Sequence, residues 1–490
     1  MSTRIAIFPD LAGSVDASVE AVELIEALSC GGDARITLDP VSGLNRYFSA
    51  PYPRKTLAYA SSTANDLSPD AFAHLLAMQA EGFPEYSAWL EQIRARIRAA
   101  YRLGSDIEVV FAPSGTDLEY VALAAVQEKA SGGVHNILLG ADEVGSGCIH
   151  SAHGCYFASE TALGLASEVG QEVEGFASIS LADVPVRCGY GLARSSVQIA
   201  QAIEQEITIA QMAGRHALIH VVHGSKTGLI LPDIVQMDAL QQRYSDNTTF
   251  VIDACQARIT TEALHDYLDR DAIVFLTGSK FMGGPPFNGF ALMRREAVQN
   301  AAKLPEGFAR IFRRAEFPAH WAGCESLNDS ENISLALRYE ASVFELERFQ
   351  KLPLAQIERI IAAFSQALED QILAPLGLSL VAPHAAGEIG EPAEHPIEMQ
   401  TLATVDVSSL PGLATFADAQ KCHRELALSG LRLGQPVKSV RKDGEWGGTL
   451  RIGMSMPQFA SFAMLDDDAL ADRLSTDMAQ IAKAISSYRP

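Results

Sequence analysis

The residue that most needs a chemical explanation is Lys280. Five apolar residues at 272–276 predict a buried strand, which runs directly into Thr277-Gly278-Ser279-Lys280. Two glycines and two prolines follow at 283–286, so small residues leave room beside the lysine. Lysine is rarely buried unless it is paired or chemically employed. The position therefore predicts an amine that forms a Schiff base, with a lysine that only extends to solvent as the weaker alternative.

An aspartate ends a second predicted strand. Phe250-Val251-Ile252 leads into Asp253, and Gln256 follows three residues later. Side chains at the carboxyl ends of strands in an open α/β sheet meet in the crevice where such sheets bind ligands. A carboxylate there can keep a pyridine nitrogen protonated, which together with Lys280 indicates pyridoxal phosphate (PLP). Taken alone, Asp253 could cap a helix and Gln256 could be a solvated turn residue.

A third segment could bind the phosphate of such a ligand. Ser114-Gly115-Thr116 stands between a predicted strand and a predicted helix. Backbone N–H groups at a helix N-terminus, a glycine and two hydroxyls together make an anion site. An ordinary helix cap is favoured for this segment by itself. The phosphate interpretation gains weight only because Asp253 and Lys280 are predicted in the same sheet.

The rest of the chain must supply the sheet that positions these residues. Apolar runs alternate with amphipathic stretches, which predicts an α/β fold with a largely parallel sheet covered on both faces. The expected strands are 108–112, 136–139, 218–222, 249–252, 272–276 and 290–293, with helices at 195–212 and 234–244 among those between them. We predict that this large domain spans residues 75–340.

Two further parts are predicted on either side of the large domain. Residues 1–74 are rich in turns and are expected to contribute to the small domain and to the mouth of the site. Long helices are expected over 333–364, with an interruption near Pro353. Strands at 378–381, 401–407 and 449–452 around a helix near 416–428 predict a smaller α+β domain over residues 341–490, with a loop at 382–398.

Composition argues against several other classes of protein. The formal net charge of −22 leaves no basic field for nucleic-acid binding. No apolar run of about 18 residues predicts a membrane span, and no secretory signal is apparent. Seven cysteines without a CxxC motif fit reduced thiols, so a cytoplasmic enzyme is expected. The spacing of His216, His220 and His223 does not indicate a metal site.

Four segments together resemble the fold-type I PLP enzymes, specifically the class V aminotransferase and cysteine desulfurase superfamily. They are Ser114-Gly115-Thr116, His-Gly-Ser-Lys-Thr-Gly at 223–228, Val-Ile-Asp-Ala-Cys-Gln at 251–256, and Thr-Gly-Ser-Lys at 277–280 with its Gly-Gly-Pro tail. Each is weak singly, but they occur in the family order at family-like spacing. The resemblance implies a PLP-dependent transferase-like large domain with a mostly parallel, seven-stranded-type sheet, and a homodimer with shared active sites.

The resemblance also implies a role for each matching residue. Lys280 forms the internal aldimine with PLP and moves the proton at the substrate α-carbon. Asp253 pairs with the pyridinium nitrogen, and Gln256 reaches the phenolic oxygen. Gly115 and Thr116, with Thr277 or Ser279, hold the phosphate. Ser114 and Ser225 are further cofactor-binding residues.

Two further roles have alternatives, namely the group that covers the cofactor ring and the part played by Arg451. The family usually stacks a ring on the cofactor, but residues 140–147 read Gly-Ala-Asp-Glu-Val-Gly-Ser-Gly. Either Val144 covers the cofactor or His150 turns in, and both remain open. Arg451 lies where related enzymes carry an arginine that binds the substrate carboxylate, which suits a guanidinium fork. A surface salt bridge is an equal alternative for Arg451.

Two reactions fit this site. The first is an aminotransferase that acts on an amino acid and a 2-oxo acid, although the missing stacking ring weakens the case for a standard one. The second is a PLP-dependent lyase or side-chain-cleaving enzyme of the kynureninase, aldolase or desulfurase kind. A desulfurase needs a mobile cysteine late in the chain, whereas Cys422 has helical surroundings and Cys324 lies too early. A ligand-binding protein without turnover is a distant third, because Lys280 and Asp253 are both present.

Overall fold

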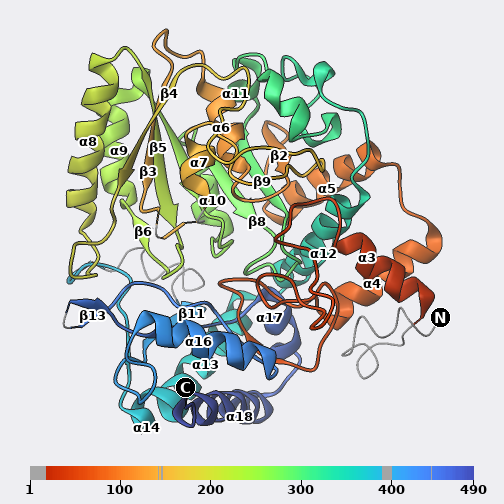
Figure 1. Cartoon of the computed structure of the whole chain (residues 1–490), viewed down its shortest axis with the longest axis vertical. Coiled ribbons are helices and arrows are strands. Elements are labelled where there is room, and N and C mark those ends of the chain that lie inside the picture. Colours follow the sequence, from red (N-terminus) through yellow and green to blue (C-terminus); the bar gives the residue numbers. More distant parts are fainter. Residues whose placement is uncertain (1–17, 142, 145–146, 389–399, 443, 490) are drawn as a thin grey trace.

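A mostly parallel sheet forms the centre of the molecule (Figure 1). The computed structural model describes residues 18–141, 143–144, 147–388, 400–442 and 444–489. The order across the sheet is β2 (Ile107–Ala112), β9 (Gly289–Arg294), β8 (Ile273–Thr277), β7 (Thr248–Asp253), β5 (His216–His223), β3 (Val134–Leu139) and β4 (Ile179–Val184). Only β9 runs antiparallel to its neighbours on this path, and the short β6 (Ile230–Leu231) pairs antiparallel with β5. The predicted α/β class and mostly parallel sheet are confirmed.

Helices cover both faces of this sheet. Successive residues of β5 point to opposite faces, so Ile219 packs with α8 (Ser196–Met212) while Leu218 packs with α6 (Leu118–Val126). Figure 1 shows α8 beside α9 (Ile234–Tyr244), with α6 beside α7 (Cys148–Ala152) on the other side of the strands. Two apolar faces explain why the central strands read as continuous hydrophobic runs. α10 (Thr261–Leu268) and α11 (Arg295–Gln299) complete this body.

The second body combines both ends of the chain. β11 (Leu402–Asp406) pairs antiparallel with β10 (Ser379–Leu380) and with β15 (Thr449–Gly453). β1 (Leu57–Tyr59) pairs in parallel with β12 (Leu431–Leu433), so an N-terminal strand lies against a C-terminal one. The remaining larger helices are α3 (Val19–Leu28), α4 (Pro69–Glu81), α5 (Tyr86–Ala100), α12 (Ile333–Gln350), α13 (Leu354–Leu368), α16 (Phe416–Leu428), α17 (Met456–Phe462) and α18 (Asp467–Ser486).

Most boundaries agree with the sequence expectations to within two residues, and α12 and α13 are separated near Pro353 as predicted. α12 runs across residue 340, so the expected boundary between the two larger domains falls inside a helix. The three-part division therefore stays a prediction. Residues 389–398 of the predicted loop lie outside the described residues. Among the helices that the structure describes, none is both long and apolar enough to cross a membrane.

Candidate active site

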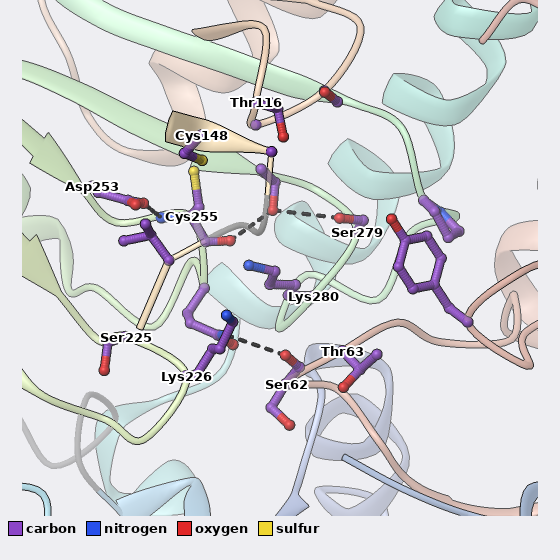
Figure 2. A pocket seen from close by; sticks show the side chains of 18 of the residues that line it. Ser62, Thr63, Thr116, Cys148, Ser225, Lys226, Asp253, Cys255, Ser279 and Lys280 are labelled. Carbon is purple, nitrogen blue, oxygen red and sulfur yellow. Dashed lines mark hydrogen bonds between the residues drawn. The ribbon is translucent and has the colours of Figure 1, made fainter. Parts of the chain in front are cut away.

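The carboxyl ends of the central strands open onto one cavity of about 390 Å³ (Figure 2). Residues that follow β2, β5, β7 and β8 all contribute to its wall. The predicted site residues on this wall are Ser114, Gly115, Thr116, Ser225, Asp253, Gln256, Thr277, Ser279, Lys280 and Arg451. Side chains separated by more than 300 residues in the sequence therefore face one space, at the place where open α/β sheets bind ligands.

Lys280 lies in a turn directly after β8, and contacts from several directions hold its backbone. Asn65 Nδ2 donates to the Lys280 carbonyl at 2.6 Å. A Cβ on Gly278 would lie 2.3 Å from Ser342 Oγ, so only glycine lets the turn pack this closely against α12. The Lys280 side chain extends into the middle of the pocket in Figure 2. Its ammonium has no hydrogen bond or ion pair with any residue that the structure describes, which leaves the amine available to a ligand.

Asp253 offers one carboxylate oxygen to the cavity. Its Oδ1 accepts a hydrogen bond from the Cys255 N–H at 3.0 Å, and the Cys255 thiol also interacts with the Asp253 carboxylate. His220 and Glu119 lie close enough to feel the charge of Asp253, with His220 Nε2 and Glu119 Oε2 3.3 Å apart. Burial lowers the pKa of His220 to about 4 and raises the pKa of Glu119 well above its usual range. Burial therefore favours the neutral form of both groups, so this pair offers Asp253 no opposite charge.

Unpaired hydrogen-bond donors gather at the N-terminus of α6. The backbone N–H groups of Gly115 and Thr116 and the Thr116 hydroxyl have no hydrogen-bond partner among the described residues. A Cβ on Gly115 would lie 2.9 Å from Thr277 Cγ2, so the glycine lets this turn approach β8. Thr277 Oγ1 in turn donates to the Cys255 carbonyl at 2.6 Å. Buried donors without partners are costly, and an oxyanion bound here would satisfy them.

Gln256 and Ser225 line the cavity but are largely occupied by the protein. Gln256 Nε2 donates to the Ser62 carbonyl at 3.2 Å, and its Oε1 accepts from Arg258 Nη1 at 2.8 Å. One N–H of the Gln256 amide remains for a ligand. The Ser225 hydroxyl donates to Glu143 Oε2 at 2.7 Å, so Ser225 mainly orders its own loop.

The structure places Val144, and not His150, on the cavity wall. His150 lies in α7 and is half-buried, whereas Val144 is buried and lines the space beside Cys148. Residues 142, 145 and 146 of the same loop lie outside the described residues. Of the two alternatives for covering a bound ring, the geometry thus favours Val144.

Arg451 is a buried residue of β15, so the surface salt bridge considered from the sequence is wrong. Its side chain is 2% exposed, and among the described residues it has no carboxylate partner. Nε donates to the Gln435 carbonyl at 2.6 Å, Nη1 to the Lys226 carbonyl at 2.9 Å and Nη2 to Thr63 Oγ1 at 3.1 Å. Nη1 also contacts the Ser62 carbonyl at 3.4 Å, which leaves one N–H, on Nη2, for a ligand. To donate two hydrogen bonds to a carboxylate, the Arg451 guanidinium would have to give up one of these contacts with the protein.

Several cavity residues were missed from the sequence, and Lys226 is one of them. It stands inside the quoted 223–228 segment, yet nothing in the pattern gave it a role. Burial, followed by the nearby Arg451 charge, lowers the pKa of Lys226 to about 8. Arg35 and Arg46 come from the irregular N-terminal segment, where no periodicity points to a site.

The cavity is basic although the chain is acidic. Its charged wall residues are Arg35, Arg46, Lys226, Lys280 and Arg451 against Glu143 and Asp253. Burial acts to raise the pKa of Glu143, but the Arg187 guanidinium at 2.7 Å outweighs it and holds that pKa below its usual value. Glu143 is thus already paired, and the cavity favours anionic ligands. No group of three or more His, Cys, Asp or Glu residues suited to a metal occurs in the described ranges.

Neither a protein-family model nor a curated protein sequence matches the chain. Solved structures do match it over most of its length. The cysteine desulfurase CsdA from Escherichia coli has a TM-score of 0.53 at 14% identity, covering 88% of this chain and 95% of that one. A cysteine desulfurase from Thermococcus onnurineus has a TM-score of 0.51 at 15% identity, covering 88% of this chain and 95% of that one. Pyridoxamine-pyruvate aminotransferase from Mesorhizobium loti has a TM-score of 0.50 at 16% identity, covering 89% of this chain and 97% of that one. The chain therefore has the fold of these desulfurases and this aminotransferase, which is the fold-type I architecture that its motifs predict.

Proposed function

We propose that the protein is a PLP-dependent enzyme that acts on amino acids, with aminotransferase activity as the function the geometry supports best. The observation that carries the proposal is Lys280, whose unpaired amine faces the same cavity as Asp253. When bound, PLP supplies a protonated ring that withdraws electrons from the substrate α-carbon. PLP fits the cavity because three kinds of group face it, namely the unpaired Lys280 amine, the Asp253 carboxylate and the unpaired donors at Gly115 and Thr116.

Each residue then has a defined task. Lys280 binds the cofactor covalently and carries the proton to and from the substrate α-carbon. Asp253 accepts a hydrogen bond from the ring nitrogen and keeps it protonated. Gly115 and Thr116 would donate to the phosphate, and Val144, which lines the cavity, would lie against the ring.

The basic cavity supports an amino acid and a 2-oxo acid as the two substrates, since both carry a carboxylate. Lys226 and Arg451 lie together, because the Arg451 guanidinium holds the Lys226 carbonyl at 2.9 Å. We propose that the Lys226 ammonium and the remaining Arg451 N–H bind this carboxylate. The Lys226 charge thereby adds to the contact that the sequence assigned to Arg451 alone.

The desulfurase alternative has less support. Cys422 is buried in α16, and burial raises the pKa of its thiol to about 12. Cys324 is packed into the apolar core, where burial also raises its pKa. Neither residue lines the cavity, and a raised pKa removes the thiolate that sulfur transfer requires. The homodimer implied by the family resemblance and the cytoplasmic location expected from the cysteines remain predictions.

Borohydride reduction of the PLP-loaded protein tests the cofactor assignment. Reduction should fix PLP irreversibly to the wild-type chain and to Lys226→Ala, but not to Lys280→Ala. Lys226 is the matched control because it is the other lysine of the cavity wall. Attachment that survives in Lys280→Ala, or a wild-type protein that binds no PLP, would refute the assignment.

A stoichiometric half-reaction tests the choice of reaction. With a single amino acid and no acceptor, an aminotransferase should release at most one equivalent of 2-oxo acid per site and resume only when a second 2-oxo acid is added. A lyase would turn over repeatedly under the same conditions. Repeated turnover without an acceptor would therefore replace the aminotransferase by the lyase alternative.

A further inference from the structure

An arginine from the N-terminal segment reaches the phosphate end of the cavity. Arg35 lines the wall, and its Nη2 contacts Ser114 Oγ at 3.3 Å. The two residues are 79 positions apart, and Arg35 precedes every strand of the sheet. Its presence beside the α6 N-terminus therefore depends on how the N-terminal segment is held.

Long-range contacts fix the chain immediately before Arg35. Arg338 of α12 donates from Nη1 to the Cys30 carbonyl at 2.6 Å and from Nη2 to the Gly31 carbonyl at 2.9 Å. Asn332 Nδ2 donates to the same Gly31 carbonyl at 3.1 Å. A Cβ on Gly32 would lie 2.7 Å from the ring of Phe287, so the glycine allows this close approach. The approach of Arg35 to the cavity is thus determined by the fold.

The guanidinium itself is oriented by its neighbours. It lies 5.2 Å from the ring centroid of Phe157 and 4.8 Å from that of Phe287. Nε donates to both oxygens of Asp33 at 2.9 Å, and Nη2 lies 2.9 Å from Asp33 Oδ2. Nη1 is the nitrogen with no partner among the described residues, and it is not one of the buried unsatisfied atoms. The unpaired N–H groups of Arg35 are therefore accessible beside Ser114.

We propose that Arg35 is a phosphate-binding residue of the cofactor site, donating through Nη1 and completing the donor set of Gly115 and Thr116. This inference rests on the proposed PLP function. A guanidinium is a strong partner for a phosphate oxyanion. Asp33 offsets much of the Arg35 charge. The hydrogen bonds that Arg35 donates should therefore contribute more to phosphate binding than its net electrostatic attraction. Arg35 thereby couples cofactor retention to the N-terminal segment of the same chain.

One acidic neighbour bears on the proposal. Asp117 Oδ2 accepts from Ser114 Oγ at 2.5 Å, and its charge acts on Arg35. Burial raises the pKa of Asp117 to about 6, so its negative charge is held less firmly than that of an exposed aspartate. Asp33 stays occupied by Arg35. The acidic groups around the guanidinium are therefore either paired or easily neutralised.

Binding of PLP and of pyridoxal, which lacks the phosphate, separates phosphate contacts from ring contacts. We expect Arg35→Met to weaken PLP binding by about 10- to 100-fold, as for loss of a charge-assisted hydrogen bond. Pyridoxal binding should change less than about threefold. Arg46→Met is the charge-matched control, because Arg46 is an exposed arginine of the same cavity wall. It should change PLP binding by less than about threefold.

Two further arms identify the source of any effect. Inorganic phosphate should compete with PLP on the wild type and compete less on Arg35→Met. If Arg35 serves an acidic group of the substrate instead, PLP binding will be unchanged and only amino-acid affinity will fall, which overturns the proposal. Equal weakening of PLP and pyridoxal overturns it as well. Arg35→Lys keeps the positive charge but loses the planar set of guanidinium N–H donors. It replaces Arg35→Met in the same measurements if that variant fails to fold, and it should weaken PLP binding by a smaller factor. A wild type that binds neither compound refutes the proposed function itself.

Discussion

Adding one methyl group at Gly115 tests whether the α6 N-terminus and the end of β8 form one close-packed phosphate site. In Gly115→Ala, the new Cβ would lie 2.9 Å from Thr277 Cγ2 and 3.2 Å from Cys255 Sγ. Neither distance is an ordinary carbon contact, which lies near 3.5–4.0 Å. The backbone of residues 114–116 must therefore move away from β8, and the donors at Gly115 and Thr116 must move with it.

The expected cost follows from two opposing terms. Overpacking a core costs about 1–3 kcal/mol, whereas replacing glycine by alanine lowers the entropy of the unfolded chain and returns about 0.4–1 kcal/mol. The free energy of unfolding should therefore fall by at most about 2.6 kcal/mol. Loss of one charge-assisted contact to the phosphate would lower PLP affinity by at least about tenfold.

Urea unfolding of the cofactor-free protein and PLP titration measure the two effects. Gly189→Ala is the matched control, because a Cβ there meets nothing within 4 Å and the residue is exposed. It should leave both quantities unchanged or raise stability slightly. Thr277→Ser removes the clashing Cγ2 and keeps the hydroxyl that donates to Cys255, so the double variant should recover part of both losses. A Gly115→Ala protein with normal stability and normal PLP affinity would refute the reasoning. So would a double variant whose losses equal the sum of the losses in the two single variants.

Two further predictions concern charges on the cavity wall. Because Lys226 is protonated below its pKa of about 8, affinity for a carboxylate substrate should be high at pH 7 and fall as pH rises through 8; a pH profile of KM should show this step, and Lys226→Met should flatten it. Glu143→Gln leaves the 9%-exposed Arg187 without its charge partner and should cost about 3–5 kcal/mol in urea unfolding. Asp106→Asn, which breaks an exposed pair with Arg294, should cost less than about 1 kcal/mol, and equal costs for the two variants would contradict the buried-pair argument.

The central sheet could be predicted because its strands are apolar on both faces. β5, β7 and β8 appear as uninterrupted hydrophobic runs, and their polar ends then mark Asp253 and Lys280 as site candidates. β4 was missed because it lies at the sheet edge and five of its six residues are at least partly exposed. Its sequence therefore lacks the apolar run that identified its neighbours.

The N-terminal contribution to the site could not be predicted for a different reason. Arg35 is positioned by Arg338 and Asn332, roughly 300 residues later, and by a glycine that touches the Phe287 ring. No local pattern encodes such contacts. The hydrogen bonds of Arg451 have the same character, since its partners are Gln435, Lys226 and Thr63. The family resemblance indicated that Arg451 binds a carboxylate, whereas only the tertiary structure shows how few of its N–H donors remain for one.

The pairing of β1 with β12 has a consequence for biosynthesis. Leu57–Tyr59 leaves the ribosome long before Leu431–Leu433, so this strand has no native partner during most of translation. Unpaired strand edges promote association with other chains. The cavity wall likewise lacks Arg451 until that residue has been synthesised. A nascent chain that stops before residue 451 should therefore lack part of the proposed substrate contact, and its β1 should be open to association with other chains.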